Sequence, residues 1–343
     1  MTRSVVGRAR ALLALCIGLL AACADDPAPP APLEGVLVLP GKTVGITDPT
    51  IHTDPSKSSV APDSLVLGVT LGDAARAYRV AMLEGLHVVN DRLGGEPIAV
   101  TWCQLCATGA VFHARVEGHP RLTFTTNEAW GGIMLMRDAQ TGSRWRQLDG
   151  LCVDGPLHGT RLRRVASSDV SRWRAWHAAH PATTLLAAED EDLVTSFERM
   201  ARDPARSTMP AFVEETLPTD DDYLPNREPV IGLVLEGKPF AWSLARLAEA
   251  RVHAETWQGV PLVVIHDAQV PTARVFDARF DGRTLTFERR GDHVHDTQTG
   301  SRWSVHGRAV EGELVGMQLT LVPSTATQWY AWRFTHPDTT LRR

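Results

Sequence analysis

The sequence has no apolar run long enough to cross a membrane as a helix, which would take roughly 20 residues. It also has no excess of basic residues: 35 Lys and Arg stand against 40 Asp and Glu, giving a formal net charge of −5. Nucleic-acid binding generally needs a basic surface. We therefore expect a globular protein without a nucleic-acid partner.

The common catalytic signatures are missing as well. The sequence contains no G-x-S-x-G, no H-E-x-x-H, no phosphate-binding P-loop and no G-x-G-x-x-G. These absences argue against the familiar serine and zinc hydrolases and against nucleotide-dependent enzymes. No residue is predicted to be catalytic, and a non-enzymatic role is favoured.

The N-terminus has the three parts of a bacterial export signal. A positive region with Arg3, Arg8 and Arg10 precedes an apolar segment, 11–20, and then Leu20-Ala21-Ala22-Cys23. This last sequence resembles the lipobox, in which the cysteine is lipid-modified and becomes the new N-terminus. The alternative is an ordinary signal peptide cut after Ala22. We predict a signal peptide over 1–22 and lipidation of Cys23, and the mature chain then has a net charge of −8 because three arginines are lost.

The segment after the lipid anchor predicts a spacer and a location. Residues 23–61 are rich in Pro, Asp, Thr and Ser and are expected to form a stiff tether, although 36–39 could be a strand docked on the fold. Ala24 follows the anchor cysteine, where Asp would favour retention in the inner membrane. We expect a cell-envelope lipoprotein, held by its lipid in the bilayer of the outer membrane and facing the periplasm.

An internal repeat organises the rest of the chain. Residues 138–145 recur as 296–303, 111–115 recur as 275–279, and Trp173-Arg-Ala-Trp176 with His180-Pro181 recurs as Trp329-Tyr-Ala-Trp332 with His336-Pro337. We predict one unit over 62–190, an acidic linker over 191–225 and a second unit over 226–343. Short β-branched runs separated by turn residues indicate a mainly β (α+β) fold, with two tandem antiparallel β-rich repeats that each end in a short helix.

The repeat separates structural residues from candidate functional ones. Features common to both units are expected to serve the fold. They include Asp138, Arg144 and Trp145, and their counterparts Asp296, Arg302 and Trp303.

The three cysteines that follow Cys23 are confined to the first unit. Cys103-Gln-Leu-Cys106 and Cys152 lie there, whereas the stretch 265–268 and Ala309 take their places in the second unit. His113 and His158 are likewise without counterparts. These five side chains are the candidate functional residues.

Several chemistries fit such cysteines. Trp102-Cys-Gln-Leu-Cys106 superficially resembles the thioredoxin motif, but no helix is predicted after it to lower the thiol pKa. Covalent haem would need a histidine at Ala107. A copper or zinc site could use Cys103 and Cys106 with Cys152 and either His158 or His113. A structural disulfide, or a reversible one, is the alternative in an oxidising compartment.

Several segments together resemble the family known as domain of unknown function 3179. They are 88–91, 95–97, 100–106, 141–147, 155–159, 180–181, 222–225 and 228–232. The resemblance implies an exported protein with a C-P-L-C-type motif, and it implies no particular activity. Gln104 stands where the family motif has proline, and Cys152 is particular to this chain. The leading hypothesis is metal binding at Cys103 and Cys106, with a thiol–disulfide redox protein and a disulfide-stapled binding module as alternatives.

Overall fold

The computed structural model describes residues 33–39, 43–55, 60–165, 168–188, 194–195, 210–217, 223–270 and 272–342. The predicted signal peptide, Cys23 and most of the linker lie outside these ranges. Within the ranges, no helix is both long and apolar enough to cross a membrane. The fold described here is that of the unit from Pro32 to Arg343.

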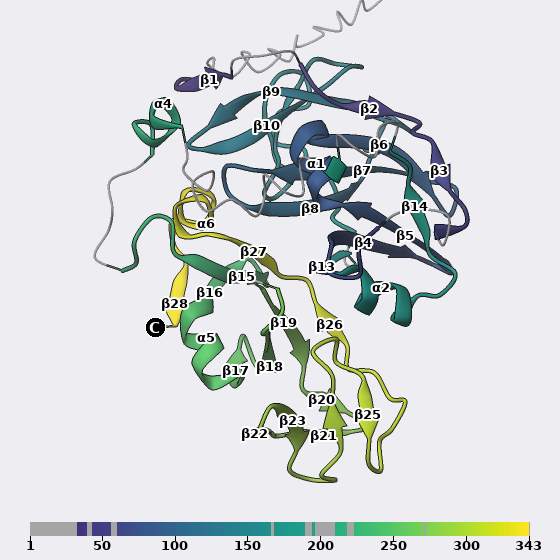
Figure 1. Ribbon diagram of the computed structural model, residues 1–343. Helices are drawn as coiled ribbons and strands as arrows, with labels where there is room; N and C mark the ends of the chain where they lie inside the picture. Colours follow the sequence, from purple (N-terminus) through teal and green to yellow (C-terminus); the bar gives the residue numbers. More distant parts are fainter. Residues whose placement is uncertain are drawn as a thin grey trace, which may run out of the picture. The chain divides into compact units, whose positions relative to one another are not determined.

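The protein is mostly β, with several sheets and a few short helices, as predicted (Figure 1). The first half, residues 60–188, begins with a β-hairpin, a helix and three further strands. Its elements are β4 (Leu65–Leu71), β5 (Ala74–Arg79), α1 (Val80–Leu86), β6 (Val88–Leu93), β7 (Glu96–Cys103), β8 (Thr108–His113), β9 (Phe124–Trp130), β10 (Ile133–Asp138), β11 (Arg144–Arg146), β12 (Cys152–Asp154), β13 (Ser168–Arg172), α2 (Trp173–Ala179) and β14 (Thr184–Leu186).

The second half, residues 223–342, opens with the same order of elements. They are β15 (Pro229–Leu235), β16 (Lys238–Ser243), α5 (Leu244–Ala250), β17 (Val252–Trp257), β18 (Val260–Asp267), β19 (Thr272–Asp277), β20 (Arg279–Phe280), β21 (Arg283–Thr284), β22 (Phe287–Arg290), β23 (His293–Asp296), β24 (Arg302–Trp303), β25 (Ala309–Glu311), β26 (Leu321–Val322), β27 (Thr325–Gln328), α6 (Trp329–Thr335) and β28 (Thr340–Arg342). Between the halves, α4 spans Ala211–Glu214.

Two features of the halves differ from the prediction. Each half closes with a strand rather than a helix, because the chain turns at the His-Pro pair and returns as β14 or β28. These strands pair in parallel with β5 and β16, so the sheets are not purely antiparallel. The indole of Trp176 donates to Thr183 Oγ1 at 2.9 Å, and Trp332 donates to Thr339 Oγ1 at the same distance, which fixes the return in both halves.

A glycine in the first strand of each half allows the last helix of that half, α2 or α6, to pack closely. A Cβ built on Gly68 in β4 would lie 2.2 Å from the ring of Trp176, and one on Gly232 in β15 would lie 2.5 Å from Trp332. No side chain fits there without moving the indole. The two tryptophans, 5% and 2% exposed, therefore lie directly on the backbone of the sheet.

Part of the predicted tether belongs to the folded body. β1 (Val36–Val38) pairs with β9, which confirms the strand expected at 36–39, and β2 (Ile46–Thr47) and β3 (Ile51–His52) pair with β6 and β14. The boundary predicted at residue 61 is therefore too late. Apolar residues inside the proline-bearing segment join sheet edges that would otherwise have unpaired backbone groups.

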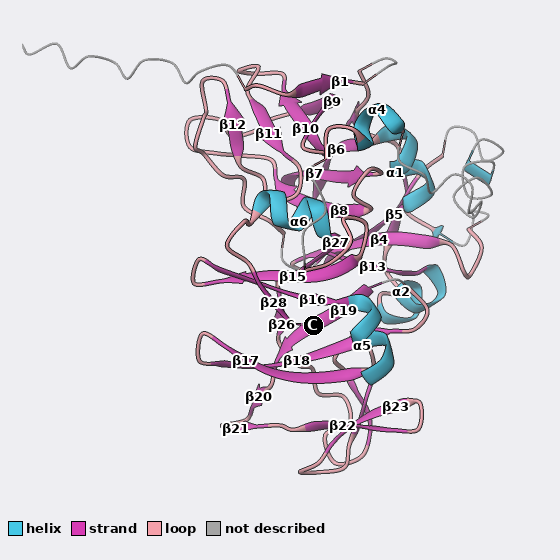
Figure 2. Ribbon diagram, turned by 90° about the vertical axis from the view of Figure 1, so that its left-hand side faces the viewer, coloured by secondary structure: helices cyan, strands magenta, loops and turns pink. Residues whose placement is uncertain are grey.

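The second half contributes directly to a core of the first half. Tyr330 and Ala331 of α6 are buried in the apolar cluster that contains Cys103, Cys106 and Trp145. Figure 2 shows α6 and β27 beside β7 and β8, and β27 and β8 are in contact. The Tyr330 hydroxyl donates to Gly132 O at 3.0 Å, so this docking is both apolar and hydrogen-bonded.

Candidate functional site

The C-x-x-C sequence forms the turn of the β7–β8 hairpin. Cys103 ends β7 and pairs with Thr108, the first residue of β8. Ala107 closes the turn with a φ of 51°, in the left-handed region. The Gln147 amide is buried beneath the hairpin and donates to Thr101 Oγ1 at 3.0 Å and to Thr108 O at 3.1 Å. The motif thus lies on a rigid strand pair, and no helix follows it.

The two thiols face each other. Cys106 Sγ lies 2.7 Å from Cys103 Sγ, and the Cys106 backbone N–H points at the same sulfur at 3.4 Å. Both side chains are buried, with Cys103 1% and Cys106 0% exposed. No further sulfur is bonded to either, and Cys152 is a third free buried thiol in the described chain.

The surroundings make the two thiols chemically unequal. Burial acts to raise the pKa of Cys103, but hydrogen bonds from the Cys106 thiol and from the backbone of Met134, Cys106 and Leu105 outweigh it and lower that pKa. Burial, together with the hydrogen bond and charge of Cys103, raises the pKa of Cys106 well above its ordinary value. Cys103 is therefore the more acidic thiol of the pair, and Cys106 is directed at it as a hydrogen-bond donor.

Residues of the second half cover the motif. Thr327 Oγ1 in β27 donates to Cys106 O at 3.2 Å, and Thr108 Oγ1 donates to Ala326 O at the same distance. Burial, followed by the charges of Cys106 and Cys103, raises the pKa of the Tyr330 hydroxyl well above its usual range. Sequence reasoning missed Thr327 and Tyr330 because nothing in a linear pattern links them to residues more than 200 positions earlier.

The predicted four-ligand metal site is not assembled. Cys152 lies in the same apolar cluster, where burial raises its pKa to about 11, and its thiol is directed at Asp154 O at 3.3 Å. His158 is exposed. His113 pairs with Ile98, five residues along β7 from Cys103, a separation of about 17 Å. Among the described residues, no three His, Cys, Asp or Glu side chains are grouped so that they could hold a metal ion.

The residues expected to serve the fold form the same motif in both halves. Trp145 Nε1 donates to Asp138 Oδ2 at 2.8 Å, and Trp303 Nε1 donates to Asp296 Oδ2 at 3.0 Å. Each aspartate also accepts from a threonine of its turn. Arg144 is paired with Glu128 and Asp154, and Arg302 with Glu311.

Strand register identifies the counterpart of the motif in the second half. Asp267 pairs with Thr272 in the hairpin β18–β19 as Cys103 pairs with Thr108. The counterpart of Cys103 is thus Asp267, two residues later than Ile265, which alignment of the sequence alone places opposite Cys103. Asp267 is bound by Arg274 at 3.0 Å, and Arg274 also donates to Asp169 of the first half at 2.8 Å. An ion-paired cluster therefore takes the place of the thiol pair.

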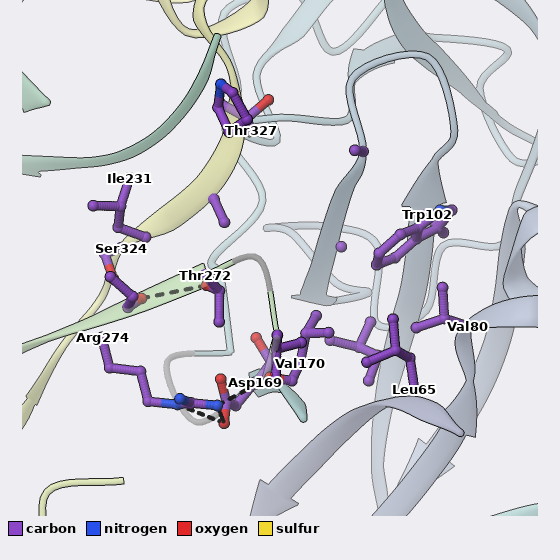
Figure 3. Close-up of a pocket in the computed structure, with 18 of the residues that line it drawn as sticks. Leu65, Val80, Trp102, Asp169, Val170, Ile231, Thr272, Arg274, Ser324 and Thr327 are labelled. Atoms are coloured by element: carbon purple, nitrogen blue, oxygen red, sulfur yellow. Dashed lines mark hydrogen bonds and ion pairs between the residues drawn. The ribbon is translucent and has the colours of Figure 1, made fainter. Parts of the chain in front are cut away.

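A cavity of about 330 Å³ separates β4, α1 and β8 of the first half from β15, β19 and β27 of the second. Trp102 and Ala107, which flank the cysteines, line it together with Thr327 and Arg164. Figure 3 shows Trp102, Val80 and Leu65 facing Ile231, Ser324 and Thr327 across this space. Cys103 and Cys106 are not among the residues that line this cavity.

Similarity to a known family extends over both halves of the chain. No curated protein and no solved structure is significantly similar to the chain. One family model, described as a protein of unknown function (DUF3179), matches residues 45–339. The match includes the C-x-x-C hairpin and the β27–α6 segment that covers it. The chain belongs to this family of proteins of unknown function, DUF3179.

Proposed function

We propose that this protein is an envelope lipoprotein whose Cys103 and Cys106 form a reversible dithiol–disulfide couple. The observation that carries the proposal is the 2.7 Å separation of their Sγ atoms, with the pKa of one thiol lowered and that of the other raised. A disulfide needs about 2.05 Å between sulfurs, so a small local movement is enough to form the bond.

The exchange follows from the inequality of the two thiols. The Cys103 thiolate attacks one sulfur of a partner disulfide, forming a mixed disulfide and expelling the partner's other sulfur as a thiolate. Cys106 then gives its proton to the expelled partner thiolate and attacks Cys103 Sγ, which forms the Cys103–Cys106 bond and releases the second partner sulfur as a thiolate. The partner disulfide gains two electrons and this chain loses two. Because the thiols are buried, the partner is a low-molecular-weight disulfide, or the β27–α6 cover moves aside.

The arrangement of donors favours this chemistry over metal binding. Structural zinc sites use four ligands. In the part of the chain that the structure describes, the two thiols meet no third ligand, and His113 and His158 lie elsewhere. Cys152 is directed at a backbone carbonyl rather than at the pair. Copper or zinc binding is therefore the rival that an experiment must separate from redox chemistry.

The setting of the couple is also part of the proposal. We infer that the halves are tandem copies, since both contain the order strand, strand, helix and three strands, with equal register in the second hairpin. A lipid on Cys23 would hold the protein at the outer membrane, facing an oxidising periplasm where a dithiol can cycle.

A redox titration of the full mature chain tests the couple. The protein is equilibrated in buffers of reduced and oxidised dithiothreitol, and free thiols are counted by maleimide labelling and mass spectrometry. We expect one two-electron transition that involves Cys103 and Cys106. The Cys152→Ser variant is the matched control and should retain the transition, whereas Cys103→Ser and Cys106→Ser should lose it.

Two outcomes would contradict the proposal. One is that Cys103 and Cys106 stay reduced, or stay oxidised, at every ratio of reduced to oxidised dithiothreitol at which the protein is folded. The other is stoichiometric zinc or copper in protein purified under reducing conditions, measured by elemental analysis and absent from Cys103→Ser. That result would establish the rival metal site instead.

A further inference from the structure

The cavity between the halves combines an apolar wall with a half-buried cation. Its apolar wall is formed by Leu65, Leu67, Val80, Trp102, Ile231 and Leu244. Its volume of about 330 Å³ is at the lower end of the range for small-molecule sites. A ligand of this size would be largely enclosed by protein.

Arg164 is the cation, and only neutral groups hold it. Its guanidinium donates to Thr325 Oγ1 at 2.6 Å, to Gly109 O at 3.1 Å and to Leu148 O at 3.4 Å. None of the carboxylates that the structure describes forms an ion pair with it. Burial lowers the pKa of Arg164 to about 10, and the charge of Asp149 opposes this only partly. The site therefore bears the desolvation cost of a cation without a compensating anion.

The carboxylates on the wall have partners of their own, and one of its other two arginines is ion-paired. Arg274 is held by Asp169 and Asp267, and Asp63 is paired with Arg174. Arg172 donates to the carbonyls of Gln269 and Asp63. Glu84 has an interaction of its own. Two arginines of this wall, Arg164 and Arg172, are thus held by neutral groups in the described part of the chain. Arg164 is the one beside the aromatic side of the cavity, because it binds the carbonyl of Gly109, the strand partner of Trp102.

We propose that this cavity binds a small amphipathic organic anion, with its carboxylate on Arg164 and its apolar part against Trp102 and the facing aliphatic side chains. A charge-assisted hydrogen bond in a water-poor site is stronger than its counterpart in water, so the head group fixes orientation. The apolar wall contributes in proportion to the area that it buries. This site is separate from the thiols, and its occupancy does not depend on their redox state.

Octanoate and 1-octanol are the matched probes, because they share an apolar chain and differ in the charge of the head group. Isothermal titration calorimetry on the full mature chain should show octanoate binding one to one and more tightly than 1-octanol. Arg164→Met should weaken octanoate binding at least about tenfold and leave 1-octanol binding nearly unchanged. Arg283→Met, a substitution of an exposed arginine in β21 away from the cavity, should change neither.

A second variant tests, independently of Arg164, whether the ligand binds in this cavity. Ser324→Trp fills the cavity with an indole and should weaken both probes, and it keeps the location testable if Arg164→Met does not fold, as judged by near-ultraviolet circular dichroism. The proposal is overturned if wild type does not bind octanoate, if folded Arg164→Met binds it as well as wild type does, or if Ser324→Trp leaves both affinities unchanged.

Discussion

Asp267 holds, in the second half, the register position that Cys103 holds in the first. Each is the last residue of its strand and pairs with a threonine, Thr272 or Thr108. The hairpin of the second half is fixed by Arg274, which binds Asp267 and reaches Asp169 across the contact between the halves. The hairpin of the first half meets β27 through the carbonyl of Cys106. The hairpin of Asp267 thus meets the first half through ion pairs, whereas the hairpin of Cys103 meets the second half through a turn that carries two thiols.

The ionic contact should be strongly stabilising. Arg274→Met leaves the buried carboxylate of Asp267 and the half-buried carboxylate of Asp169 without their arginine. Breaking a buried pair in this way typically costs about 3–5 kcal/mol. Urea unfolding should show that loss. Arg290→Met, which removes an arginine paired with Glu288 at the surface, should cost no more than about 1 kcal/mol. Equal effects of the two variants would show that the cluster contributes little.

The thiols should react in a fixed order. A short pulse of iodoacetamide on the reduced protein, read by peptide mass spectrometry, should modify Cys103 before Cys106, because only the thiolate reacts and the pKa of Cys103 is lowered while that of Cys106 is raised. Cys152, whose pKa is raised to about 11, should also lag. Faster alkylation of Cys106 than of Cys103 would reverse the roles assigned to them.

Much of the fold could be predicted from the sequence, because alternating β-branched runs and turn residues report local structure directly. The mostly β class and the strand at 36–39 followed from such patterns. The helices α1 and α5 did not, since each has only seven residues, which is too short for a helical apolar period to stand out in the sequence. The closing strands β14 and β28 were missed because pairing in parallel with a distant strand leaves no local signal.

The site was predictable only in part. The sequence singles out Cys103 and Cys106, because thiols in one half and not the other stand out by composition. It also groups them with His113, which the strand register places on a remote part of β8. Arg164 has no sequence signature at all. It becomes a candidate binding residue only because it bonds to Thr325, 161 positions later, and lines the cavity between the halves.

The close approach of Trp176 to β4 predicts a sharp effect of a single methyl group. Gly68→Ala places a Cβ where the indole ring lies, and overpacking of this kind costs about 1–3 kcal/mol. Thermal unfolding should show a lower Tm. The double variant Gly68→Ala/Trp176→Leu should be less destabilised than the sum of the two single variants, because the smaller side chain makes room. Strict additivity would contradict the proposed clash.

His336 should make stability depend on pH in the mildly acidic range. Burial, against Trp332 with a centroid distance of 4.3 Å, lowers its pKa to about 4. The unfolded chain, with a histidine pKa of about 6.5, therefore binds a proton first as the pH falls, and stability declines from about pH 6.5 to 4 by up to about 3 kcal/mol. Urea unfolding at several pH values should show this decline in wild type and in the exposed control His158→Gln. An unchanged slope in His336→Gln would assign the decline to other groups.

Asp149 should control stability at lower pH. Burial raises its pKa, but hydrogen bonds and charge from Arg146 and then Arg161 prevail and lower it to about 2. A carboxylate whose folded pKa lies below its unfolded value of about 3.9 stabilises the protein above that value and loses the effect as the pH falls towards 2. This difference between the folded and unfolded pKa values corresponds to about 2.5 kcal/mol of stability at neutral pH.

Asp149→Asn should therefore reduce the free energy of unfolding at pH 7 and flatten its fall between pH 4 and 2, measured by urea unfolding. Because the asparagine still leaves Arg146 buried, with a side chain 10% exposed, the loss at pH 7 should equal or exceed that amount, and a smaller loss would mean that the two arginines are not held by this carboxylate.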